Sequence, residues 1–213
     1  MGSSIFFQSV RKVRKGGTVT PVTPTPKTEL VDIGGQKWAK TNVSAVYKGL
    51  FVFDAKDVTA VTAFVSKTNE GEPACFKTPA GDMLYNMYVD LDKLLPETDP
   101  TMTVPTKDDL QGLASYYEDN FKAGESKEEH ETAMRDRVDA IKNDLGVKLA
   151  GIFVIGAGGP DQAHPDFEGW WAHDKSAVFQ IMDSAKGTFV GVQQLEDQRL
   201  GLSVRLIQKP TAA

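Results

Sequence analysis

The clearest hydrophobic patterning lies in the last third of the chain, from Leu149 to Lys209, and it predicts a β-sheet. The run Leu149–Ile155 is rich in β-branched and aromatic residues and ends at the glycine-rich stretch 156–160, as a buried strand does before a tight turn. Two further apolar runs, 177–182 and 188–192, also predict strands. The closing segment alternates like a half-buried strand, with Leu202, Val204 and Leu206 on one face and Ser203, Arg205 and Ile207 on the other.

Two adjacent tryptophans, Trp170 and Trp171, lie within this region. Successive side chains of an extended segment point to opposite faces, so the two indoles must diverge. We expect one indole to anchor the core and the other to face a second packed layer or the surface.

Strand candidates also fill the region before residue 66. Segments 28–33 and 36–40 flank Gly34-Gly35, a pair typical of a hairpin turn. Segments 47–53 and 58–65 are two more strand candidates, because both are rich in β-branched or aromatic residues.

Two amphipathic helices are predicted between residues 106 and 146. Thr106 with Asp109, and Ser126 with Glu129, have the spacing of capping boxes, and Gly146 stands where a C-terminal glycine cap belongs. Apolar residues recur at helical spacing: Leu110, Leu113, Ala114, Tyr117 and Phe121, then Met134, Val138, Ile141 and Leu145. The order of strands, two helices and strands predicts an α+β domain with the helices segregated from an antiparallel sheet.

Length and composition fit one globular domain with an appendage. The chain has 213 residues and a net charge of -5, which argues against a nucleic-acid partner. The single cysteine, Cys75, excludes an intrachain disulfide and is expected to be a small core residue. No apolar run is long enough to cross a bilayer, so we expect no membrane insertion.

The first 28 residues differ from the rest. An apolar tip precedes a basic cluster, which is the reverse of the order in an export signal: Ile5, Phe6, Phe7 and Val10, then Arg11, Lys12, Arg14 and Lys15. The Thr-Pro repeats of 18–26 favour an extended, semi-rigid spacer. We interpret 1–28 as a docking peptide and linker that binds a partner chain, and 29–213 as the folded domain; an unstructured tail is the alternative.

Chemical motifs are few. The glycine-rich stretch 156–160 has Asp161 where a dinucleotide-binding motif needs glycine, and Pro160 and Pro165 oppose the required helix. We therefore interpret it as a structural turn. Cys75 has no histidine near it in sequence and no Gly-x-Ser-x-Gly elbow occurs, so we expect no enzyme activity and no cofactor.

Two ligand hypotheses concern the tryptophan region. His164, Asp166, Glu168 and His173 could ligate a cation, but their spacing matches no metal motif, and we predict no metal site. Trp170 and Trp171, with His173 beside them, could form a platform for sugar rings. Core packing of the two indoles is the favoured alternative, since aromatic residues supply much of a core.

Four short blocks, in order, resemble the major paralogous domain family of bacterial surface proteins. They read DIGGQKWAKTN (32–42), VPTKDDL (104–110), GIFVIGAGG with GWWA (151–159 and 169–172) and GLSVR (201–205). The likeness covers residues of about 30 to 209. It departs from the family pattern at Val104 for leucine, Leu110 for tryptophan and Leu206 for cysteine.

The resemblance implies a branch of the C-type-lectin-like fold, in which the first and last strands pair and the ends of the domain lie close together. Calcium-dependent sugar binding is not expected, because Glu72-Pro73-Ala74 lacks the third ligand and no Trp-Asn-Asp occurs. The oxidases that share this fold use cysteines that the chain lacks.

These features together predict a virion structural protein of a tailed bacteriophage: a head fibre, capsid decoration or tail-fibre-like subunit. Its N-terminal arm would bind a capsid or tail protein, and its lectin-like domain, expected as a homotrimer, would be displayed on the virion surface toward host-surface glycans. The alternatives are an exported bacterial cell-surface or fimbria-associated adhesin and an intracellular binding module.

Overall fold

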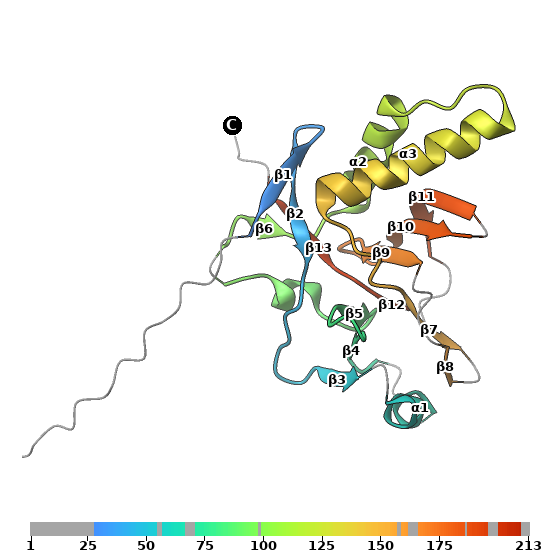
Figure 1. The fold of residues 1–213 in the computed structure, drawn as a ribbon. Helices are drawn as coiled ribbons and strands as arrows, with labels where there is room; N and C mark the ends of the chain where they lie inside the picture. Colours follow the sequence, from blue (N-terminus) through green and yellow to red (C-terminus); the bar gives the residue numbers. More distant parts are fainter. Residues whose placement is uncertain are drawn as a thin grey trace, which may run out of the picture.

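The computed structural model describes residues 28–54, 57–66, 71–97, 99–156, 159–161, 166–185, 187–195 and 200–209. Within these residues three α-helices and three β-sheets form an α+β protein, which confirms the predicted class (Figure 1). The helices are α1 (Val58–Ser66), α2 (Lys107–Asn120) and α3 (Lys127–Leu145), with a single 3₁₀ turn at Leu91–Leu94.

A four-stranded sheet contains both ends of the described fold. Its strand order is β1 (Leu30–Ile33), β2 (Gln36–Asn42), β13 (Arg205–Gln208) and β6 (Met102–Thr103). The predicted hairpin is confirmed: Gly34 and Gly35 have φ of 61° and 85°, as a type I′ turn requires. The first and last strands do not pair, contrary to the resemblance, because β2 lies between them and bonds to both.

A three-stranded antiparallel sheet lies under the two long helices. Its order is β11 (Gly187–Gln194), β10 (Ala177–Ser184) and β9 (Phe167–Trp171), and α2 and α3 pack on β10 and β11 (Figure 1). The buried apolar side chains between helices and strands form what we call the Trp170 cluster: Ile33, Trp38, Leu110, Leu113, Tyr117, Val138, Ile141, Leu145, Trp170, Phe179, Ile181 and Ile207.

A six-stranded sheet forms the other half of the fold. Its order is β3 (Phe51–Asp54), β4 (Ala74–Lys77), β5 (Met83–Asn86), β12 (Leu200–Leu202), β7 (Phe153–Gly156) and β8 (Gly159–Asp161). Only β3 and β4 are parallel among its described pairs. Gly159 and Pro160 of the glycine-rich stretch belong to strand β8, which pairs with β7, while residues 162–165 lie outside the described residues.

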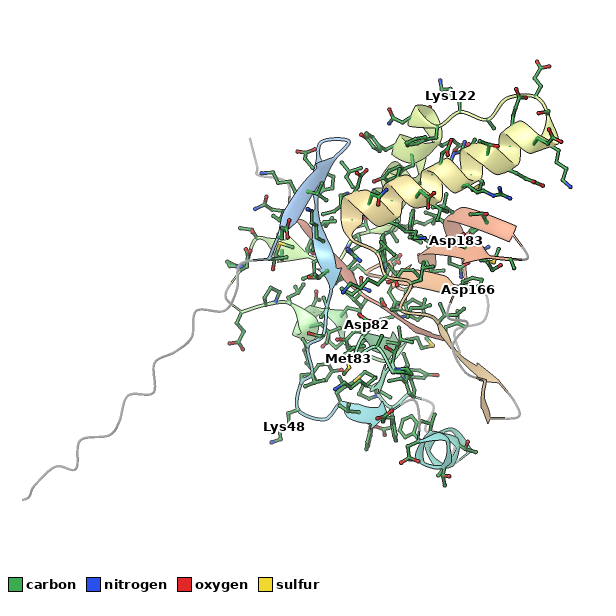
Figure 2. All side chains as sticks on the ribbon, viewed as in Figure 1. Lys48, Asp82, Met83, Lys122, Asp166 and Asp183 are labelled. Carbon is green, nitrogen blue, oxygen red and sulfur yellow. The ribbon has the colours of Figure 1, made fainter. Side chains whose placement is uncertain are left out.

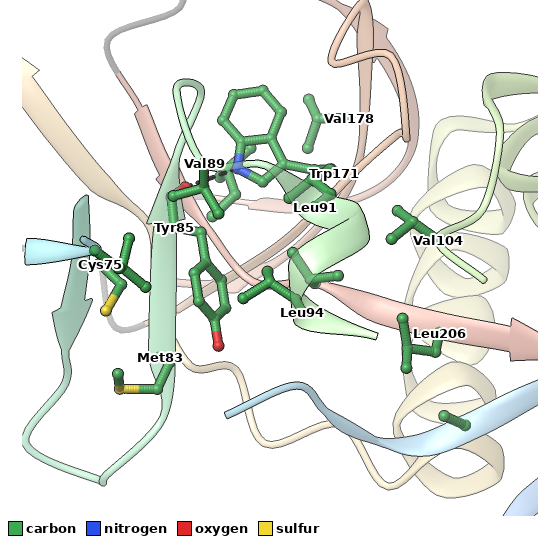
Figure 3. Packing of buried hydrophobic residues seen from close by; sticks show 14 of the residues in the cluster. Cys75, Met83, Tyr85, Val89, Leu91, Leu94, Val104, Trp171, Val178 and Leu206 are labelled. Carbon is green, nitrogen blue, oxygen red and sulfur yellow. Dashed lines mark hydrogen bonds between the residues drawn. The ribbon is translucent and has the colours of Figure 1, made fainter. Parts of the chain in front are cut away.

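A second core, the Trp171 cluster, packs against this sheet (Figure 3). It includes Cys75, Met83, Tyr85, Val89, Leu91, Leu94, Val104, Trp171, Val178, Leu202, Val204 and Leu206. Trp171 Nε1 donates to the Tyr85 carbonyl at 2.7 Å. Cys75 is fully buried, as predicted, and burial raises the pKa of its thiol to about 12, which keeps it protonated and unreactive at neutral pH.

The closing segment 200–208 joins all three sheets. Its β12 part pairs with β5 and β7, Ser203 bridges to Trp170 of β9, and its β13 part pairs with β2 and β6. The prediction that Leu202, Val204 and Leu206 lie on one face of this segment is confirmed, because all three belong to the Trp171 cluster. The prediction of a half-buried strand is wrong, because both faces are covered and Leu202 to Ile207 are all buried.

Segment 58–65 is helix α1, so its prediction as a strand is wrong. The Asp57 carboxylate accepts the Ala60 N–H at 3.0 Å, as a helix-capping side chain does. Val61 and Phe64, three residues apart, belong to a small apolar cluster with Phe53 and Phe76. This packing overrides the strand propensity of the β-branched residues.

The predicted helix ends are confirmed. Thr106 with Asp109, and Ser126 with Glu129, form reciprocal capping boxes, and Gly146 ends α3 in the left-handed conformation with φ of 62°. Three residues of the predicted stripes are only partly buried, Ala114, Phe121 and Met134, and Ala133 next to Met134 is buried.

Candidate functional site

A buried polar cluster lies where the sheets meet α3, and it is the most unusual chemistry in the described structure. Its members are Asn42 at the end of β2, Glu168 of β9 and Arg205 of β13. Glu168 is 0% exposed and Arg205 is 1% exposed. Charged side chains are rarely buried to this extent unless they are paired and hydrogen-bonded.

The Glu168 carboxylate accepts three hydrogen bonds. Oε1 accepts from Asn42 Nδ2 at 2.7 Å and from Trp170 Nε1 at 2.6 Å, and Oε2 accepts from the Ala150 N–H at 2.7 Å. Burial raises the pKa of Glu168, while these donors and the charge of Arg205 act in the opposite direction. The carboxylate therefore ties β9 to β2 and to the segment that precedes β7.

The Arg205 guanidinium connects β13 to β2 and to α3. Nη1 donates to the Ala39 carbonyl at 2.9 Å and to the Leu145 carbonyl at 2.7 Å. The Leu145 carbonyl belongs to the last turn of α3, where the helix dipole favours a cation. Burial lowers the pKa of Arg205 to about 10, opposed by the carboxylates of Glu168 and Asp82, so the side chain stays charged at neutral pH.

The Trp170 indole completes this arrangement. The Arg205 guanidinium lies 4.6 Å from the ring centroid, a cation–π contact, and the Phe179 ring stacks at 5.1 Å with an interplanar angle of 9°. Trp170 therefore contacts both charged residues, one through its N–H and the other through its π-face.

A narrow crevice connects this cluster with the surface. Its volume is about 100 Å³, and it is lined chiefly by polar and charged residues: Lys40, Asn42, Asp82, Lys148, Glu168 and Arg205. Two buried atoms that belong to lining residues have no hydrogen-bond partner in the described part of the chain, Arg205 Nε and Asn42 Oδ1. The lining of the crevice is therefore mainly polar and charged.

The sugar-platform hypothesis is not supported for the two tryptophans. Trp170 and Trp171 are both 0% exposed and lie in different clusters on opposite sides of β9. This confirms that the side chains diverge and that they serve as core residues. His173 alone is exposed, and its Nε2 lies 3.1 Å from Asp92 Oδ1.

Those residues considered for a cation that have a described position do not come together as a ligand set. His164 lies outside the described residues, Glu168 points into the cluster, and His173 contacts Asp92. Among the residues with a described position, no group of three or more His, Cys, Asp or Glu side chains is arranged to hold a metal ion.

The proposed docking residues lie outside the described residues, so their prediction stays untested: Ile5, Phe6, Phe7, Val10, Arg11, Lys12, Arg14 and Lys15. No helix in the described part of the chain is long and apolar enough to cross a membrane.

Comparison of the chain with protein-family models, with curated proteins and with solved structures finds no match. The family resemblance therefore stays a prediction. Sequence reasoning missed the polar cluster, although the signal was present: Asn42, Trp170 and Arg205 each belong to a different one of the recognised blocks.

Proposed function

We propose that the chain is a virion structural protein of a tailed bacteriophage, a head fibre, capsid decoration or tail-fibre-like subunit. Its N-terminal arm binds a capsid or tail protein. The folded residues that follow form a head that is displayed on the particle surface.

The observation that carries this proposal is the placement of the two ends of the head. Leu30 in β1 lies opposite Ala39, and Ile207 in β13 lies opposite Trp38, so the terminal strands flank β2. Two strand spacings separate them, about 10 Å. Figure 1 shows β1 and β13 on one side of the molecule, with α1 and the β7–β8 hairpin on the other. A head held through residues before Leu30 therefore presents this far side outward.

The residues before the head have the composition of a tether and an anchor. Thr-Pro repeats such as those of 18–26 favour extension at about 3 Å per residue, so we propose a spacer of roughly 25 Å. The apolar and basic residues at 5–15 offer burial and charge to a partner surface. This order of anchor, spacer and head is what a displayed subunit needs.

We further propose that the head is a C-type-lectin-like domain of the major paralogous domain family. Support comes from the polar cluster, because three of the four recognised blocks supply Asn42, Trp170 and Arg205 to a single buried network. Residues that maintain the fold of a family are expected to contact one another in the core, as these three do.

We do not assign host-glycan adhesion to Trp170 or Trp171, because both are enclosed in the core. We propose a homotrimer as the assembly, and edge strand β3 favours self-association. β3 has only β4 as a partner among the described strands, and Phe51 and Val52 are 47% and 52% exposed. Light scattering of the purified chain should then give three times 23.2 kDa.

Deletion of residues 1–15 tests the proposal. The shortened chain should fold with an unchanged circular dichroism spectrum and melting temperature, yet be missing from purified particles. As a matched control, replacing 18–26 with Gly-Ser repeats of equal length should keep the chain on the particle, because the anchor remains.

Full occupancy of particles by the shortened chain would overturn the proposal. Recovery of the intact chain from the outer surface of cells, in processed form and with none in particles, would instead favour the exported adhesin.

A further inference from the structure

We draw no further inference here: the strongest candidate, the groove between α3 and the turn that joins β10 to β11 beside Asp183 (Figure 2), is lined by side chains of both charges around the partly buried Met134, and nothing in the described part of the structure shows what covers it.

Discussion

At the scale of single residues, Trp170 and Trp171 divide the core between them. Trp170 stacks on Phe179 in one cluster and donates to Glu168, whereas Trp171 lies in the other cluster and donates to Tyr85. Each indole has a buried hydrogen-bond partner, as buried tryptophans usually do. Two adjacent residues thus fix β9 between both halves of the fold.

Trp170→Ala should lower the free energy of unfolding by about 3–5 kcal/mol, because it leaves a large cavity and removes a hydrogen bond to a buried carboxylate. Urea denaturation measures this loss. His173→Ala, at an exposed residue two positions after Trp171, should change the free energy of unfolding by less than about 0.5 kcal/mol. A Trp170→Ala protein as stable as wild type would contradict the assignment of this indole to the core.

Glu168→Gln should change how stability depends on pH. Burial raises the folded-state pKa of Glu168 above its unfolded value of about 4.3, so the folded protein holds this proton more tightly. The contribution of Glu168 to stability is therefore fully present below about pH 4.3 and is lost as the pH rises toward the folded pKa. Glutamine does not titrate and lacks this change.

Urea denaturation of wild type and Glu168→Gln at several pH values between 4 and 8 provides the comparison. The stability of wild type relative to the variant should fall as the pH rises. A difference that stays constant, or one that grows with pH, would mean that Glu168 is not held toward its protonated form.

At the scale of elements, the capping residues are the sequence features that predict the helix ends most reliably. Gly146 has φ of 62°, and a Cβ at this position would lie 3.3 Å from the Lys40 carbonyl oxygen. Gly112 lies inside α2, and apart from its chain neighbours and its own helix backbone no described atom lies within 4 Å of an added Cβ. We therefore expect the substitution of glycine by alanine to have opposite effects on stability at these two positions.

Gly146→Ala should destabilise the protein by about 1–2 kcal/mol, because alanine strains the left-handed conformation and crowds β2. Gly112→Ala should stabilise it by up to about 1 kcal/mol through higher helix propensity. Melting temperatures of both variants give the signs. The same sign for both would contradict the described end of α3.

The elements differ in how far the sequence predicts them. Both long helices, the Gly34-Gly35 hairpin and the strands at 177–182 and 188–192 follow from local pattern, and the structure has each of them. Helix α1 was missed because its β-branched residues favour a strand, while a cap at Asp57 and packing of Val61 and Phe64 decide otherwise. Strand β4 was missed because it directly follows Pro73 and contains alanine and lysine, which are uncommon in strands.

The candidate site was harder to predict for a different reason. Asn42, Glu168 and Arg205 are separated by more than a hundred residues or by whole strands, and only the crossing of β2, β9 and β13 brings them together. No local sequence pattern predicts contacts between residues that are this far apart in the chain. A buried Arg205 beside Val204 and Leu206 was nevertheless a hint, because an arginine within an apolar closing strand needs a partner.

At the scale of the whole molecule, we propose a division between a folded head and an N-terminal anchor. The closing segment 200–208 fastens all three sheets of the head, and β1 and β13 bring its two ends to one sheet. A head with its own two cores is expected to fold independently of residues 1–28.

The most direct measurement is a graft of residues 1–28 onto a monomeric fluorescent protein, mixed with purified phage particles that lack the chain. The number of fluorescent molecules that sediment with each particle is then counted. The account predicts saturable binding at the copy number of the native chain, and loss of that binding when Phe6 and Phe7 are changed to serine. Sedimentation no greater than that of the fluorescent protein alone would contradict it.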